Sequence, residues 1–209
     1  MGYISMYSVL IPFILGILLF KKINNYLLIL LILLFFSFIT DFTVYKINES
    51  RVFVWPIISV LQFALLMIVF ILNTNYVWKR KILLFSIPLF IIYAVFYIFI
   101  LKDKSQLFPN LMTLTLFGFL IISISSFIEI YNNVEHNNLF KYPFFWINVA
   151  VLIYFSGNLF LTLSYNIFTM DNVFQLYIPI HSTLNTAKNL LFAMAFIVNF
   201  YPLRKESLS

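Results

Sequence analysis

The sequence predicts an all-α fold, a polytopic transmembrane helical bundle with seven spans. The 209 residues are 63% hydrophobic and only 10% charged, whereas a soluble domain carries about 25% charged residues. The apolar residues gather in runs that approach or exceed the roughly 20 residues needed to cross a hydrocarbon core about 30 Å thick. Short polar links separate the runs, so we expect sequence neighbours to pack as antiparallel pairs.

Seven apolar runs define the expected spans, and each ends at a polar or basic link. The runs cover approximately residues 4–20, 26–45, 52–72, 81–101, 107–131, 143–165 and 173–200. They form a single transmembrane domain over residues 1–203, followed by a short cytoplasmic tail at 204–209. The first run begins almost at Met1, with no basic stretch before it and no small-residue cleavage site, so we expect it to remain as a span.

The distribution of Lys and Arg predicts the orientation. With the N-terminus outside, eight basic residues lie on the cytoplasmic side and four in the outer loops, and the inner side of a membrane protein is the basic one. The net charge of +6 therefore acts as a topology signal, and we expect membrane lipids but no nucleic acid as partners. Abundant Phe, Asn, Ile and Lys are typical of an AT-rich bacterial genome, which indicates a bacterial cytoplasmic (inner) membrane.

Residues 179–189 place a polar stripe inside the seventh run. On a helix, His181, Asn185 and Lys188 fall within about 60° of one another. A lysine at the centre of a bilayer costs about 2.5–3.5 kcal/mol, and such residues mark functional sites by default. We expect this stripe to face other helices or a wet cavity and Lys188 to bind a ligand. The alternative is a structural lysine that bonds carbonyls and Asn185, or one that extends along the helix to the interface.

Three further residues complete the predicted ligand-binding site. Asp41, in the outer half of the second run, is expected to pair with Lys188 or His181, or else to lie at the outer interface. Asn158 follows a Ser-Gly pair and either contacts the ligand or bonds a neighbouring helix. Gln62 is the amide residue of the third run.

The chain also shows a candidate internal repeat. Residues 56–64 and 179–187 match at five of nine positions and align Gln62 with Asn185. Spans one to three and five to seven would then be two parallel three-helix repeats, with span four linking them, and Gln62 would face Asn185. Because a few apolar residue types make up most of the chain, chance explains the match equally well.

Catalytic and metal-binding patterns are missing from the sequence. There is no cysteine and only two histidines, and no zinc, calcium, P-loop or dinucleotide motif occurs. We therefore expect no metal, no cofactor and no catalytic residue, and an intramembrane enzyme is the least favoured class. Glu129, near the end of the fifth run, is expected to be an interfacial charge.

Residues 144–148 and 152–160, together with His181-Ser182-Thr183-Leu184-Asn185 and Lys188-Asn189, resemble a family of small seven-span bacterial membrane proteins whose function is not established. Related modules serve as membrane sensor regions attached to signalling kinases, so the resemblance implies a sensor that works with a separate partner. The likeness to retinal-binding opsins is topological only, because the third span has no carboxylate counter-ion. Small lysoplasmalogenases fit poorly, since their Gly-Asp dipeptide has no counterpart here.

The sequence therefore predicts an integral membrane protein that binds or senses a small anionic or amphipathic ligand. Its partners would be lipids, that ligand, and either a separate signalling protein or further copies of the chain. The alternative is a small-solute transporter built on the two three-helix repeats.

Overall fold

The fold is entirely helical within the described part of the chain. The computed structural model describes residues 2–46, 51–100, 107–133, 136–164 and 170–200. Its elements are α1 (Gly2–Ser8), α2 (Leu10–Leu18), η1 (Phe20–Lys22), α3 (Asn25–Lys46), α4 (Arg51–Asn73), α5 (Val77–Ile100), α6 (Leu107–Asn133), η2 (His136–Lys141), α7 (Pro143–Ser164) and α8 (Met170–Phe200). Each expected run is helical, which confirms the all-α prediction, while the tail at 204–209 lies outside the described residues.

Two described helical stretches are long and apolar enough to cross a membrane, fewer than the seven spans predicted from the sequence. They are Thr113–Asn133 in α6 and Pro143–Leu163 in α7. Three shorter apolar stretches are Ser5–Leu18, Asn25–Thr40 and Ile57–Asn73. Basic residues in the first turns of α5, and the polar run in α8, lower the hydropathy of those two helices.

The first expected helix is divided into two pieces. The helix is interrupted for one residue at Val9, between α1 and α2, although Val9 keeps right-handed helical dihedral angles (φ −65°, ψ −24°), and Pro12 follows in the first turn of α2. Because proline has no backbone N–H, Pro12 cannot donate a helical hydrogen bond to the carbonyl of Ser8. The expected helix over residues 4–20 is therefore interrupted at this point by one missing backbone hydrogen bond.

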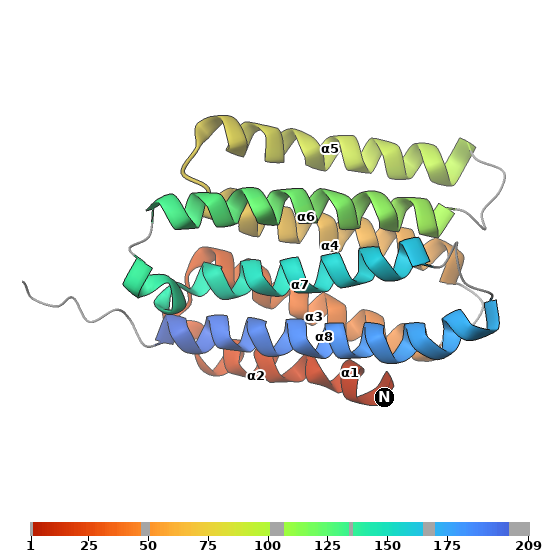
Figure 1. Cartoon of the computed structure of the whole chain (residues 1–209), viewed down its shortest axis with the longest axis horizontal. Coiled ribbons are helices and arrows are strands. Elements are labelled where there is room, and N and C mark those ends of the chain that lie inside the picture. The colour runs from red at the N-terminus through yellow and green to blue at the C-terminus, as the bar shows by residue number, and fades with distance from the viewer. Residues whose placement is uncertain (1, 47–50, 101–106, 134–135, 165–169, 201–209) are drawn as a thin grey trace, which may run out of the picture.

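The helices lie side by side along one long direction (Figure 1). α7 packs extensively on both α6 and α8, α3 packs on α4, and α1 and α2 both lie against α8. α5 lies at one edge of the bundle, packed on α4 and only lightly on α6. Phe119 of α6 is the centre of an aromatic core, with ring centroids 4.6 Å from Phe155 of α7 and 5.2 Å from Phe63 of α4.

One end of the bundle collects basic residues. η1, the start of α5, the end of α6, η2 and the end of α8 all lie at this end (Figure 1). They carry Lys21, Lys22, Lys79, Arg80, Lys81 and Lys141. We call it the basic end. Residues that the sequence assigns to one side of a membrane therefore share one end of the molecule.

Gly157 brings α7 and α8 close together, and replacing it with alanine is expected to destabilise the bundle. A Cβ at this position would lie 2.5 Å from Leu184 Cδ1 and 3.2 Å from its Cγ, so the side chain of Leu184 would have to move. We expect Gly157→Ala to lower the free energy of unfolding by about 1–3 kcal/mol. Gly118→Ala is the control, because no atom lies within 4 Å of its Cβ; this change should stabilise the helix by up to about 1 kcal/mol. Equilibrium unfolding in bicelles measures both, and equal losses would contradict the close approach.

Candidate functional site

Polar and aromatic side chains meet between α7 and α8, and we call this group the α7–α8 cluster. It consists of Tyr154, Asn158, Tyr177, His181 and Lys188. His181 Nδ1 lies 2.6 Å from Asn158 Oδ1, so it bridges the two helices. The His181 ring stacks on Tyr177, with centroids 5.6 Å apart and planes 6° apart. Three of the six predicted site residues therefore come together here: Asn158, His181 and Lys188.

The hydrogen bonds of Asn158 determine how His181 is oriented. Asn158 is fully buried (0% exposed), and its Nδ2 donates to the Tyr154 carbonyl at 2.7 Å. Its Oδ1 must then be an acceptor, so His181 Nδ1 carries the proton of that bond. In the neutral ring Nε2 is left as an acceptor. No described residue hydrogen-bonds to Nε2. The His181 ring is therefore held through Nδ1, and its Nε2 can accept a hydrogen bond from a ligand.

Lys188 places a cation against an aromatic face. Its Nζ lies 4.2 Å from the ring centroid of Tyr154, and the side chain is half-buried. A cation over a tyrosine ring gains a cation–π interaction that strengthens as water is removed. The centroid of the Tyr154 ring is also 6.0 Å from that of the His181 ring, so one tyrosine lies near both basic side chains. This contact holds the Lys188 ammonium against α7, beside the other residues of the cluster.

The other predicted site residues bond elsewhere. Asn185 Nδ2 donates to Ser5 Oγ of α1 at 2.9 Å, and Gln62 Nε2 donates to Ser37 Oγ of α3 at 3.3 Å. Gln62 and Asn185 are thus held by different neighbours. The side chain of Asp41 lies outside the described residues.

A second amide also ties α8 to α1. Asn189 Nδ2 donates to Ser8 Oγ at 2.8 Å, and Ser8 Oγ donates to the Ser5 carbonyl at 2.6 Å. Asn189 Oδ1 is buried with no partner among the described atoms. Together with Asn185, these contacts form an amide–hydroxyl seam beside Val9.

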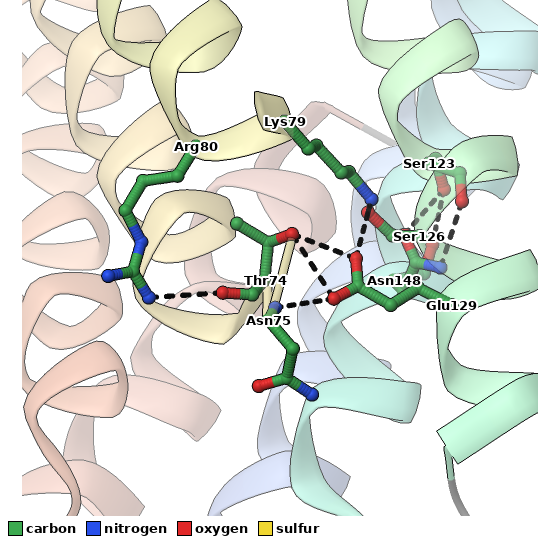
Figure 2. A network of polar contacts seen from close by, with 8 residues as sticks. All are labelled: Thr74, Asn75, Lys79, Arg80, Ser123, Ser126, Glu129 and Asn148. Atoms are coloured by element: carbon green, nitrogen blue, oxygen red, sulfur yellow. Dashed lines mark hydrogen bonds and ion pairs between the residues drawn. The ribbon is translucent and has the colours of Figure 1, made fainter. Parts of the chain in front are cut away.

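A buried ion pair at the basic end was missed by the sequence reasoning. Lys79 Nζ lies 2.9 Å from Glu129 Oε2 and also donates to Ser126 Oγ at 3.0 Å. Thr74 Oγ1 lies 2.9 Å from Oε2, and the backbone N–H of Asn75 donates to Oε1 (Figure 2). We call these five residues the Glu129 network. It joins the link between α4 and α5 to the last turns of α6.

Glu129 is buried inside the bundle although it lies near the end of α6. Glu129 is 6% exposed and Lys79 is 5% exposed. Ser126 precedes Glu129 by three residues, so both lie on one face of α6. Further along α6, Ser123 Oγ donates to Asn148 Oδ1 at 2.7 Å, and Asn148 Nδ2 donates back to the Ser123 carbonyl at 3.0 Å (Figure 2). Polar bonds thus run from α5 through α6 to α7.

A cavity of about 190 Å³ adjoins the Glu129 network. Its wall combines amides, a carboxylate, hydroxyls and two aromatic rings. The lining residues are Asn73, Asn75, Ser126, Glu129, Ile130, Asn133, Tyr142 and Phe144. Because it lies near the ends of α4 and α6, it is in the opposite half of the bundle from His181, which lies in the first half of α8.

Neither a search for metal-binding groups nor a comparison with known proteins assigns a function to these residues. Among the described side chains, no three His, Cys, Asp or Glu residues are grouped so that they could hold a metal ion. No protein-family model, no curated protein and no solved structure matches the chain. Function is therefore inferred from the geometry of the two polar regions.

Proposed function

We propose that the chain is a seven-span integral membrane protein that binds or senses a small anionic or amphipathic ligand at the α7–α8 cluster. It lies in a bacterial cytoplasmic membrane, with the N-terminus outside and the basic end at the cytoplasm. The observation that carries the proposal is the meeting of a half-buried ammonium and a singly held imidazole on adjoining helices. Intramembrane basic groups of this kind mark ligand sites by default.

The surface of the bundle supports a membrane location. Large apolar side chains point outward, including Phe85 of α5 (70% exposed) and Phe160 of α7 (67% exposed). Soluble monomers rarely expose extended apolar surface, whereas lipid covers it without cost. At the basic end, Trp78 and Phe140 are also exposed, as in the aromatic belts of membrane interfaces.

The chemistry of the cluster favours an anionic head group. Lys188 supplies a positive charge for a carboxylate or a phosphate. His181 Nε2 can accept a hydrogen bond when the ring is neutral and donate one when it is charged. The rings of Tyr154 and Tyr177 offer apolar faces for the rest of the ligand.

Lys188→Met is expected to remove the bound ligand. Losing a charged hydrogen-bond partner costs about 1.5–3 kcal/mol, so affinity should fall by a factor of about 10 to 150. The measurement is mass spectrometry of small molecules and lipids that co-purify with each variant at matched folded yield, followed by titration with the species found. The control is Lys81→Met, which removes an exposed lysine from α5.

A species retained by wild type and Lys81→Met but missing from Lys188→Met would identify both ligand and site. If Lys188→Met retains the same species at the same affinity, the proposed site is wrong. A sensor of this kind would pass its signal to a separate signalling protein or through contacts between copies of the chain.

A small-solute transporter is the alternative, and one observation favours it. The first expected span lacks one helical hydrogen bond beside Val9, where Pro12 has no N–H to donate, and the helical pieces on both sides pack against α8. Broken helices near polar groups are a recurring feature of transporters built from repeats. Uptake of the identified ligand into proteoliposomes would favour transport, whereas saturable binding without flux would favour sensing.

A further inference from the structure

The cavity beside the Glu129 network has the size of a small-molecule site. At about 190 Å³ it exceeds the roughly 150 Å³ that accommodates a benzene molecule in a protein interior. Asn75 and Asn133 are exposed, whereas Ser126 and Glu129 are buried. The cavity thus leads from the surface at the basic end to a buried carboxylate.

Several groups in the wall have hydrogen-bonding capacity to spare. Within the described part of the chain, the side-chain amides of Asn75 and Asn133 and the hydroxyl of Tyr142 make no hydrogen bond. Figure 2 shows the Asn75 side chain pointing away from the Glu129 carboxylate, which its backbone N–H contacts. Burial, with Tyr26 and Glu129 nearby, raises the pKa of Tyr142 to about 12, so its hydroxyl stays protonated at neutral pH.

The charges around the cavity favour a neutral ligand. The negative charge of Glu129 is balanced by Lys79 at 2.9 Å. An anion in the cavity would face the carboxylate, and the Lys79 ammonium paired with that carboxylate weakens its attraction for a cation. Neither sign of charge gains a clear partner.

The carboxylate keeps room for one more donor. Glu129 receives hydrogen bonds from Asn75, from Lys79 and from Thr74, whose hydroxyl lies 3.1 Å from Oε1 and 2.9 Å from Oε2. Because the Thr74 hydroxyl has one hydrogen, three hydrogens serve about four acceptor positions. Phe144 and Tyr142 flank the cavity, with ring centroids 6.3 Å apart and an edge-to-face arrangement. The wall thus offers an acceptor at the base, amides at the mouth and aromatic faces at the side.

We propose that this cavity binds a small polyol, a neutral ligand with adjacent hydroxyl groups. One hydroxyl donates to Glu129, others exchange hydrogen bonds with the amides and with Tyr142, and the C–H face of the ligand lies on the aromatic rings. Such a group occurs both as a free solute and as the polyol head group of a membrane lipid. The site is separate from the α7–α8 cluster and does not depend on its ligand.

Two cavity variants and two matched controls test this site. Tyr142→Phe removes only a hydroxyl that no described protein group uses, and Asn133→Leu removes an exposed amide from the mouth. Tyr76→Phe and Asn132→Leu make the same chemical changes at exposed positions outside the cavity lining. None of the four substitutions removes a hydrogen bond of the Glu129 network.

The first arm uses free glycerol and myo-inositol as probes, with saturation-transfer NMR on the protein in detergent micelles. Millimolar concentrations avoid the general stabilisation that polyols produce by exclusion from protein surfaces. We expect binding to wild type and to both controls, and weakening by about two- to tenfold for each cavity variant, the effect of one lost hydrogen bond.

The second arm uses nanodiscs of phosphatidylglycerol or of phosphatidylcholine, followed by native mass spectrometry of retained lipid. Retention of the glycerol head group by wild type and controls, with loss in the cavity variants, would assign the site to a lipid. Binding in the first arm alone would assign it to a free solute. If neither arm separates the cavity variants from their controls, the cavity holds only water and the proposal is overturned. Lys188→Met should leave both arms unchanged.

Discussion

Replacing Glu129 with leucine is expected to lower the free energy of unfolding by about 3–5 kcal/mol, because it leaves the buried ammonium of Lys79 without its counter-charge. Thr74 and the backbone N–H of Asn75 lose their acceptor at the same time. Only Ser126 would remain to receive a hydrogen bond from Lys79. Equilibrium unfolding of wild type and variant in bicelles measures the loss.

The double variant Lys79→Met/Glu129→Leu provides the control. Replacing both members of a buried pair by apolar groups is often nearly neutral, so much of the lost stability should return. A double-mutant cycle then gives the coupling between the two side chains. If the effects of the two single substitutions simply add, the ion pair does not hold α5 to α6.

Replacing Phe119 with alanine is expected to lower the free energy of unfolding by about 3–5 kcal/mol. Its ring lies among those of Phe155, Phe63 and Phe70, at 4.6, 5.2 and 6.3 Å between centroids. In a bilayer the loss is chiefly one of packing contacts, because lipid is as apolar as the core. The same unfolding assay in bicelles measures it.

Phe117→Ala is the matched control for that substitution. Phe117 lies on the same helix and is 54% exposed, so its ring is expected to face lipid. A surface change of this kind should alter stability by no more than about 0.5 kcal/mol. Equal losses at positions 117 and 119 would show that Phe119 is not at the centre of the core.

The helices could be predicted closely because long apolar runs with short polar links leave little choice of structure. The expected run at 143–165 begins at the same residue as α7, Pro143–Ser164. The interruption at Val9 follows from Pro12, which has no N–H to donate to the Ser8 carbonyl. The number of spans depends on where each helix meets lipid, which hydropathy indicates only in part.

The sequence correctly grouped His181 with Lys188 but not with Asn185, and the geometry of α8 explains the difference. His181 and Lys188 are seven residues apart, nearly two full turns, and both reach α7. Asn185 is rotated by about 60° from Lys188, and α8 is packed between α1 and α7, so this rotation turns Asn185 toward Ser5.

Other parts of the two polar regions depended on tertiary structure. Tyr154 precedes Asn158 by four residues, a spacing that places both on one face of a helix. The chain has thirteen tyrosines, however, so this spacing alone does not single out Tyr154. The Glu129 network could not be foreseen, because the rotation of α5 decides that Lys79 turns inward while Arg80 and Lys81 remain exposed.

The length of α8 determines how deep the α7–α8 cluster lies in the proposed membrane. α8 has 31 residues and is therefore about 46 Å long, well beyond a hydrocarbon core of about 30 Å. Its final turn is held at the basic end, where Asn199 Nδ2 donates to the Lys22 carbonyl at 2.8 Å. Measured from there, about 30 Å of helix reaches His181, while Lys188 lies about 10 Å deeper. In the proposed orientation, an amphipathic ligand would keep its head group near the surface of the outer leaflet and its tail among the acyl chains, and would enter the cluster sideways from that leaflet.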